Sequence, residues 1–194
     1  IIYKDLGKID KAIKGYERVI NLNPEFIEAH NNLGNVYKDL DENKKAIDSY
    51  QKAITIQPNF AEAHYNLGII KKYQKRIDDA VFYFKAAISL MPNFSQAHNN
   101  LGISYTLLGQ LKKAKKCYEK SIAINTEYYE AYNNLGFNLM SNGKIDSAAK
   151  YFEKAIEINP NYAEAYKNLG IIFKKRKQFD KAMSFYEQAF NLKS

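Results

Sequence analysis

Histidine is the first residue type in this sequence whose spacing suggests chemistry. The three histidines, His30, His64 and His98, recur every 34 residues. A row of imidazoles could bind zinc, which needs ring nitrogens about 2 Å from the metal. Equivalent residues on neighbouring packed helices, however, lie roughly 10 Å apart. The spacing therefore predicts histidines that pack in the core, with no metal site and no cofactor.

No group of residues typical of an active site stands out. The chain has no glycine-rich phosphate loop and no set of serine, histidine and acid. Its acidic pair Asp78-Asp79 sits at an expected helix start, where carboxylates offset the helix dipole. We therefore expect that the protein is not an enzyme.

Lysine-rich clusters contribute to a formal charge of +8, from 29 basic and 21 acidic residues. The clusters lie at residues 71–76, 112–116 and 174–177. The first and third end an expected helix, where cations favour the negative end of the dipole. Aromatic residues occupy packing positions instead of alternating with these lysines, so we expect no nucleic-acid partner.

A membrane span and a disulfide are also not expected. The apolar runs are only a few residues long, far short of the roughly 18 that a spanning helix needs. Cys117 is the one cysteine, so no internal disulfide can form. A single thiol fits a reducing compartment, and we expect no membrane partner and an intracellular location, cytoplasmic or nuclear.

A repeat of 34 residues positions all of these side chains. A Leu-Gly pair recurs at that step, at Leu33-Gly34, Leu67-Gly68, Leu101-Gly102, Leu135-Gly136 and Leu169-Gly170. Twelve residues after each glycine stands an alanine, and four further on an aromatic ring, as in Ala46 and Tyr50. A proline ends the unit at Pro58, Pro92 and Pro160. Small residues let two helix backbones approach closely, and the rings fill the space beside them.

Each unit is predicted to form two helices. Apolar residues fall at helical spacing over residues 62–73 and again over 78–90. The motif Asn-x-x-Glu at Asn59–Glu62 indicates a helix start just after the proline. The full units are 27–60, 61–94, 95–128 and 129–162, with a nearly complete unit at 163–194 and a partial unit at 1–26. Because the first unit lacks its beginning, we expect the chain to be a segment of a longer array.

The 34-residue period and the residue types that recur in each unit resemble those of the tetratricopeptide repeat (TPR) family over the whole chain. His30 and Tyr132 stand where that family often has tryptophan. The resemblance implies an all-α fold, a right-handed superhelical α-solenoid of helix-turn-helix units that forms a single array. It also implies a protein-binding scaffold in which the first helices of the units line a concave groove.

The first helix of each unit carries four positions on one face, spaced i, i+4, i+7 and i+11. The second position is always asparagine and defines the asparagine ladder: Asn32, Asn66, Asn100, Asn134 and Asn168. Asparagine is a poor residue for a helix interior, and its amide matches both groups of a peptide backbone. We predict that this ladder holds an extended peptide and that replacing a rung barely changes folding. The alternative role for these amides is hydrogen bonding between helices.

Positions near the ladder are predicted to select peptide side chains. They are Asn35, Tyr65, Ile69, Lys72, Tyr73, Ile103, Phe137 and Ile171. Together with the ladder, the segment Asn59–His64 resembles the TPR arm of O-linked N-acetylglucosamine transferases, in which asparagines at this position hold substrate peptides. That resemblance implies the substrate-recognition arm of a glycosyltransferase.

The alternative function is structural, as a spacer or a self-assembling module that stacks end to end. Helices expected at residues 1–20 and 180–192 would each present an apolar stripe that another unit normally covers. Ile13, Met183 and Phe190 are the candidates for this uncovered surface. The expected partner is thus a protein or peptide in the concave groove, or a second copy at the ends.

Overall fold

The computed structural model describes residues 2–192, and every regular element in that range is an α-helix. The helices are α1 (Ile2–Leu22), α2 (Ile27–Asp39), α3 (Asn43–Ile56), α4 (Ala61–Tyr73), α5 (Ile77–Leu90), α6 (Ser95–Leu107), α7 (Leu111–Ile124), α8 (Tyr129–Ser141), α9 (Ile145–Ile158), α10 (Ala163–Lys175) and α11 (Phe179–Asn191). The prediction of an all-α fold built from helix pairs is confirmed for the described residues.

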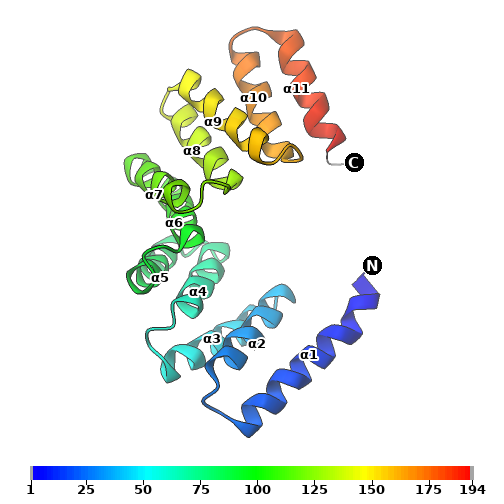
Figure 1. Cartoon of the computed structure of the whole chain (residues 1–194), viewed down its shortest axis with the longest axis vertical. Helices are drawn as coiled ribbons and strands as arrows, with labels where there is room; N and C mark the ends of the chain where they lie inside the picture. The colour runs from blue at the N-terminus through cyan, green and yellow to red at the C-terminus, as the bar shows by residue number, and fades with distance from the viewer. Residues whose placement is uncertain (1, 193–194) are drawn as a thin grey trace. The chain divides into compact units, whose positions relative to one another are not determined.

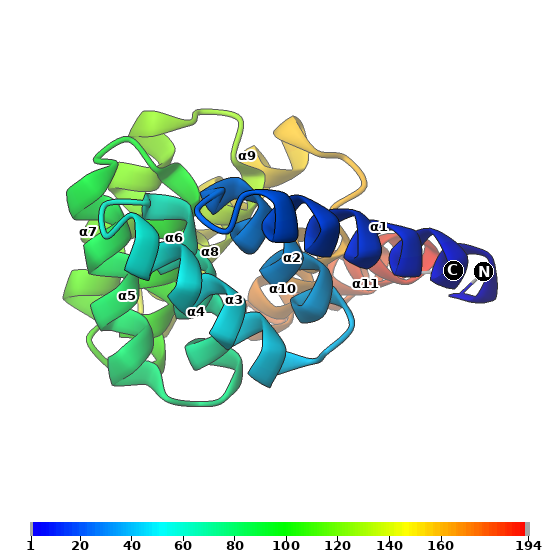
Figure 2. The same cartoon turned by 90° about the horizontal axis from the view of Figure 1, so that it is seen from below.

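The helices group into two compact units, Ile1–Pro92 and Asn93–Ser194. In each unit the first helix of a repeat packs against the second helix that follows it, as α4 does against α5 and α8 against α9 (Figure 1). Figure 2 shows α4 and α5 side by side from a second direction. The second helix also contacts the first helix of the next repeat in its unit, as α3 contacts α4 and α7 contacts α8.

Glycine and an aromatic ring bring the two helices of a repeat together. A Cβ atom at Gly68 of α4 would lie only 2.6 Å from Cε1 of Phe84 on α5. The Phe84 side chain has no exposed surface. The same approach recurs between Gly34 and Tyr50, Gly102 and Tyr118, Gly136 and Phe152, and Gly170 and Tyr186. The prediction that small residues allow close helix packing at these positions is confirmed.

Consecutive repeats share one buried core. In the first unit the cluster that joins two repeats consists of Ala46, Tyr50 and Ala53 of α3 with Ala63, Leu67 and Ile70 of α4. All of these side chains are at most 1% exposed. Each repeat therefore depends on its neighbour for burial, as expected of a repeat protein.

The turn between the two helices of a repeat uses a left-handed backbone. The φ angle is 71° at Gly109 and 75° at Gly143, which glycine adopts freely. The same position holds Asp41 and Lys75 at 60° and Lys177 at 59°. A side chain in this conformation is strained, so the helix packing on both sides imposes the turn whatever the residue.

The predicted helix start just after the proline is confirmed for α4, although the start is not capped by a side chain. Helix α4 begins at Ala61 after Phe60, and this N-cap residue makes no side-chain capping hydrogen bond. The Asn59–Glu62 motif therefore does not act as a capping box. An asparagine organises the turn at the equivalent point of a later repeat, where Oδ1 of Asn159 accepts a hydrogen bond of 3.1 Å from the backbone N–H of Asn161.

Candidate functional site

The asparagine ladder lies on the first helices, with Asn32 and Asn66 in the first unit and the other rungs in the second. Asn66, Asn100 and Asn168 are 8%, 7% and 4% exposed, and Asn32 and Asn134 are half-buried. The rungs thus lie largely between helices.

Three rungs donate a hydrogen bond to the preceding repeat. In the first unit, Nδ2 of Asn66 lies 3.1 Å from Oδ1 of Asn31. The second unit has the same bond from Asn134 to Asn99 at 3.0 Å and from Asn168 to Asn133 at 2.8 Å. These bonds connect the first helices of adjacent repeats, which is the alternative role that the sequence left open for the amides.

The acceptors of these bonds are residues that sequence reasoning missed. Their signal is the doubled asparagine before Leu-Gly at residues 31–32, 99–100 and 133–134. The unit 61–94 has Tyr65-Asn66 at the same place. Asn100 donates within its own helix, from Nδ2 to the carbonyl oxygen of Gln96 at 3.0 Å.

The oxygen atoms of the bonded rungs are directed away from these bonds. No described residue donates a hydrogen bond to Oδ1 of Asn66, Asn134 or Asn168. Over residues 8–192, Nδ1 of His64 is the one fully buried side-chain polar atom without a partner, so none of these three oxygens is fully buried.

The i+7 position is apolar in four of the five units and partly accessible. Ile69, Ile103 and Ile171 are half-buried, and Phe137 is 44% exposed. Asn35 is different, because its Oδ1 accepts a 2.8 Å hydrogen bond from the hydroxyl of Tyr50. Asn35 therefore contributes to the packing of its own repeat.

The i+11 position carries the most exposed apolar side chains of the first helices. Tyr73 on α4 is 75% exposed, and Leu107 on α6 is 60% exposed. In the second unit α6 contacts α8, the helix of Phe137. Leu107 and Phe137 therefore give this unit apolar surface of the kind that marks a protein-binding site.

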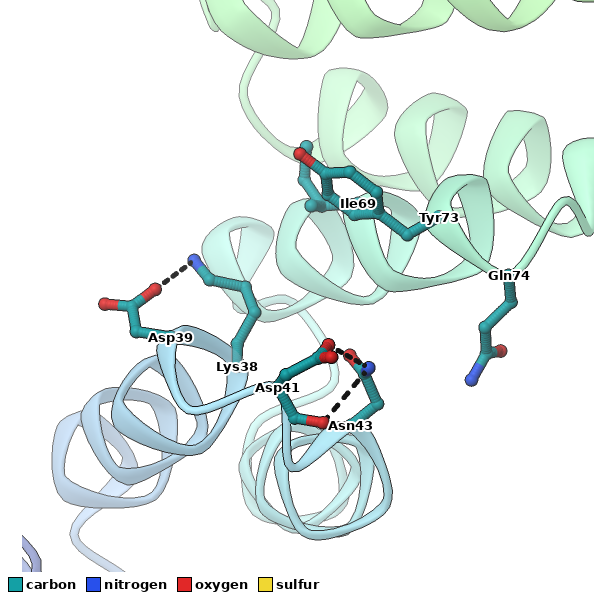
Figure 3. A pocket seen from close by; sticks show the side chains of 7 residues that line it. All are labelled: Lys38, Asp39, Asp41, Asn43, Ile69, Tyr73 and Gln74. Carbon is teal, nitrogen blue, oxygen red and sulfur yellow. Dashed lines mark hydrogen bonds and ion pairs between the residues drawn. The ribbon is translucent and has the colours of Figure 1, made fainter.

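A pocket of about 640 Å³ lies in the first unit, between the first helices of two repeats (Figure 3). Its lining residues are Lys38, Asp39, Asp41, Asn43, Ile69, Tyr73 and Gln74. Ile69 and Tyr73 lie side by side on α4, and the charged residues come from the end of α2 and the turn after it. The pocket thus pairs an apolar wall with a polar rim, a combination suited to a peptide side chain and its backbone.

The polar rim is held by local interactions. Lys38 Nζ lies 3.7 Å from Asp39 Oδ1, and Nδ2 of Asn43 donates a 2.8 Å hydrogen bond to Oδ1 of Asp41. The carboxylate of Asp39 is 75% exposed, so it remains accessible to a partner.

Lys72 and Tyr65 lie outside the lining of this pocket. The Lys72 Nζ atom lies 5.7 Å from the centre of the Tyr73 ring. Burial lowers the pKa of Lys72, because the charged ammonium is disfavoured away from water. The ring of Tyr65 lies 5.8 Å from the ring of Phe84, so Tyr65 packs against the second helix of its own repeat.

The histidines hold the turns between repeats. Nε2 of His30 lies 2.8 Å from the carbonyl oxygen of Pro24, and Nε2 of His64 lies 2.9 Å from that of Pro58. Because a carbonyl only accepts, Nε2 must carry the proton in both rings. The structure gives these two histidines a packing role.

No cluster of three or more histidine, cysteine, aspartate or glutamate residues that could hold a metal ion occurs among the described residues. Within residues 2–192, no helix is both long and apolar enough to cross a membrane.

Repeated helix pairs with a shared core define an α-solenoid, a class of protein-interaction scaffold. Family models described as TPR repeat and tetratricopeptide repeat match residues 2–41, 34–72, 61–94, 95–128 and 127–194. These matches together extend over residues 2–194, and the chain belongs to the tetratricopeptide repeat family.

Solved structures share this fold. A crystal structure of MamA is 26% identical, with a TM-score of 0.72 over 83% of this chain and 94% of that chain. PilF of Pseudomonas aeruginosa is 23% identical, with a TM-score of 0.85 over 98% and 86% of the two chains. YrrB, described as a TPR protein with an unusual peptide-binding site, is 23% identical, with a TM-score of 0.71 over 91% of each chain. No curated protein matches the chain.

Proposed function

We propose that the chain binds an extended segment of a partner protein along its first helices. The rung oxygens accept hydrogen bonds from the N–H groups of the peptide backbone, and exposed apolar residues contact its side chains. The observation that carries this proposal is the pair of amide oxygens of Asn134 and Asn168 in the second unit, which accept no hydrogen bond from a described residue and are not fully buried. Phe137 lies one helical turn after Asn134 on α8, so the two groups share a face.

The dimensions of a repeat suit an extended peptide. Packed helices lie roughly 10 Å apart, and an extended chain advances about 3.3 Å per residue. Neighbouring rungs therefore meet about every third peptide residue. Backbone contacts of this kind accept many sequences, and the apolar positions then supply selectivity.

Replacing both Leu107 and Phe137 by serine is expected to weaken peptide binding on the order of tenfold or more. Each exposed side chain loses part of the roughly 1.5–3 kcal/mol that full burial of such a residue contributes. The probe is a 12-residue unstructured peptide selected on the chain from a displayed random library, and its dissociation constant is measured by fluorescence anisotropy.

Phe82→Ser is the matched control, because Phe82 is 65% exposed but lies on the second helix α5. The control should bind the selected peptide as the unmodified chain does. Unchanged binding by the double variant, or an equal loss of affinity in the control, would contradict the proposal that exposed apolar residues of the first helices contact the peptide.

The finer assignment, a substrate-recognition arm of a glycosyltransferase, remains part of this proposal. It predicts that the complete gene encodes a glycosyltransferase domain in the same polypeptide. A complete gene without such a domain would exclude the arm while leaving peptide binding intact.

Self-association is the second candidate function, and the surface of α11 favours it. Met183 and Phe190 are 60% and 73% exposed. The equivalent residues four repeats earlier are Ile47 and Ile54 on α3, and they pack against the core shared with the next repeat. The third candidate for this surface, Ile13, is half-buried.

If α11 mediates stacking, the mass of the chain in light scattering should rise with concentration. The double variant Met183→Ser/Phe190→Ser should then stay monomeric, because the apolar surface that drives association is lost. A monomer at millimolar concentration would contradict this candidate.

A further inference from the structure

Helix α7 concentrates positive charge on one exposed face. The helix carries five lysines and a single glutamate. Two of the lysines have partners: Lys113 Nζ lies 5.4 Å from the centre of the Tyr105 ring, and Lys115 Nζ lies 3.1 Å from Oε1 of Glu119. The other three are exposed, and none has an ion pair or hydrogen bond within the described part of the chain. We name them the lysine row: Lys112, Lys116 and Lys120.

The lysine row follows the axis of the helix. Its members are four residues apart and so lie on one face, at steps of about 6 Å. The equivalent positions of the other second helices hold Asp10, Lys14 and Arg18 in α1, Lys44, Asp48 and Lys52 in α3, Asp78, Phe82 and Ala86 in α5, Asp146, Lys150 and Lys154 in α9, and Asp180, Ser184 and Gln188 in α11. Among these six helices, the three positions are all basic in α7 alone.

Helix stability does not account for the row. Lys112 lies in the first turn of α7, where the positive end of the dipole disfavours a cation. The helices α5, α9 and α11 have aspartate in that turn. The lysine clusters at the ends of α4 and α10, in contrast, lie where the dipole favours them.

We propose that the lysine row docks an acidic, extended segment of a partner protein. Alternate residues of an extended chain lie about 6.6 Å apart on one side, close to the step of the lysines. Acidic side chains at every second position would therefore pair with successive members of the row. This surface lies on a second helix, so the proposal is independent of the first-helix surface proposed above.

The chemistry around the row favours an acidic peptide over other anionic partners. No large apolar residue of α7 is exposed, so the helix that carries the row has nothing of its own to insert into a membrane or to bury against an amphipathic helix. The aromatic ring of α7, Tyr118, is 2% exposed and cannot stack on a nucleobase.

The test uses a fluorescein-labelled 12-residue peptide of alternating glutamate and serine, with binding followed by anisotropy at low salt. The variant Lys112→Glu/Lys116→Glu/Lys120→Glu should bind on the order of tenfold more weakly or worse, since each exposed ion pair contributes modestly and three are lost. The control Lys52→Glu/Lys85→Glu/Lys150→Glu changes the net charge equally at scattered exposed sites and should lose less than about threefold.

Three results would overturn the proposal. Equal losses in the two variants would show that only the net charge matters. Tighter binding of an oligothymidylate, or of vesicles rich in phosphatidylserine, than of the peptide through the same lysines would assign the row to another class of partner. The third result concerns a variant that replaces the glutamate variant if circular dichroism shows that the latter has lost helix, namely Lys112→Gln/Lys116→Gln/Lys120→Gln. If this glutamine variant binds the peptide as tightly as the unmodified chain does, the docking surface is rejected.

Discussion

Replacing Gly68 by alanine is expected to destabilise the chain by about 1–2 kcal/mol, although alanine is the better helix former. The new Cβ atom would lie 2.6 Å from Cε1 of Phe84, and that ring has no exposed surface to which it could move. Overpacking of a core costs about 1–3 kcal/mol, which exceeds the gain of up to about 1 kcal/mol in helix propensity. The measurement is urea denaturation followed by circular dichroism.

The same substitution at Gly15 should have the opposite sign. Gly15 lies within α1, and a Cβ atom there would meet no atom within 4 Å. Gly15→Ala should therefore gain up to about 1 kcal/mol from helix propensity alone. A smaller side chain opposite the clash should also rescue part of the loss, so Gly68→Ala combined with Phe84→Leu should cost less than the sum of the two changes. Equal stabilisation by Gly15→Ala and Gly68→Ala would contradict the close approach of α4 and α5.

The fold could be predicted from the sequence because the same residue types recur at the same packing positions in every unit. One Leu-Gly pair is weak information, but five in register, each followed by alanine and an aromatic ring, define two helices that approach closely. The helix start was also predictable, because the Asn-x-x-Glu motif at Asn59–Glu62 indicated a start just after the proline and α4 begins at Ala61. The motif did not reveal that the N-cap residue is Phe60, which makes no side-chain capping hydrogen bond.

The candidate site was predictable only in part. The helical spacing correctly placed the ladder and the apolar positions on the first helices. The spacing within one helix could not show that the amide nitrogens bond to the previous repeat, because that bond depends on the distance between helices. The doubled asparagines at residues 99–100 and 133–134 carried this information, but its meaning required the geometry.

Replacing Asn168 by alanine is expected to weaken binding of a selected peptide about fivefold and to destabilise the chain by about 1 kcal/mol. The loss in affinity corresponds to one neutral hydrogen bond, worth about 1 kcal/mol. The loss in stability follows from the 2.8 Å bond to Asn133, because its buried acceptor is left without a partner. Here the structure changes the prediction from sequence, in which a rung could be replaced with little effect on folding.

Asn133→Ala is the matched control for this prediction. Asn133 is 4% exposed, and it contributes the acceptor of the same bond, so its removal should cost similar stability. The Oδ1 atom of Asn168 is retained in this variant. A role confined to helix packing therefore predicts equal effects of the two substitutions on stability and none on affinity.

The most direct test of the proposed function is the dissociation constant of the selected peptide for these two variants and the unmodified chain, measured below their melting temperatures. We predict an affinity about fivefold lower for Asn168→Ala and within about twofold of the unmodified chain for Asn133→Ala. Equal affinities for all three proteins, with both variants destabilised, would show that the asparagine ladder only joins the repeats and does not bind the peptide.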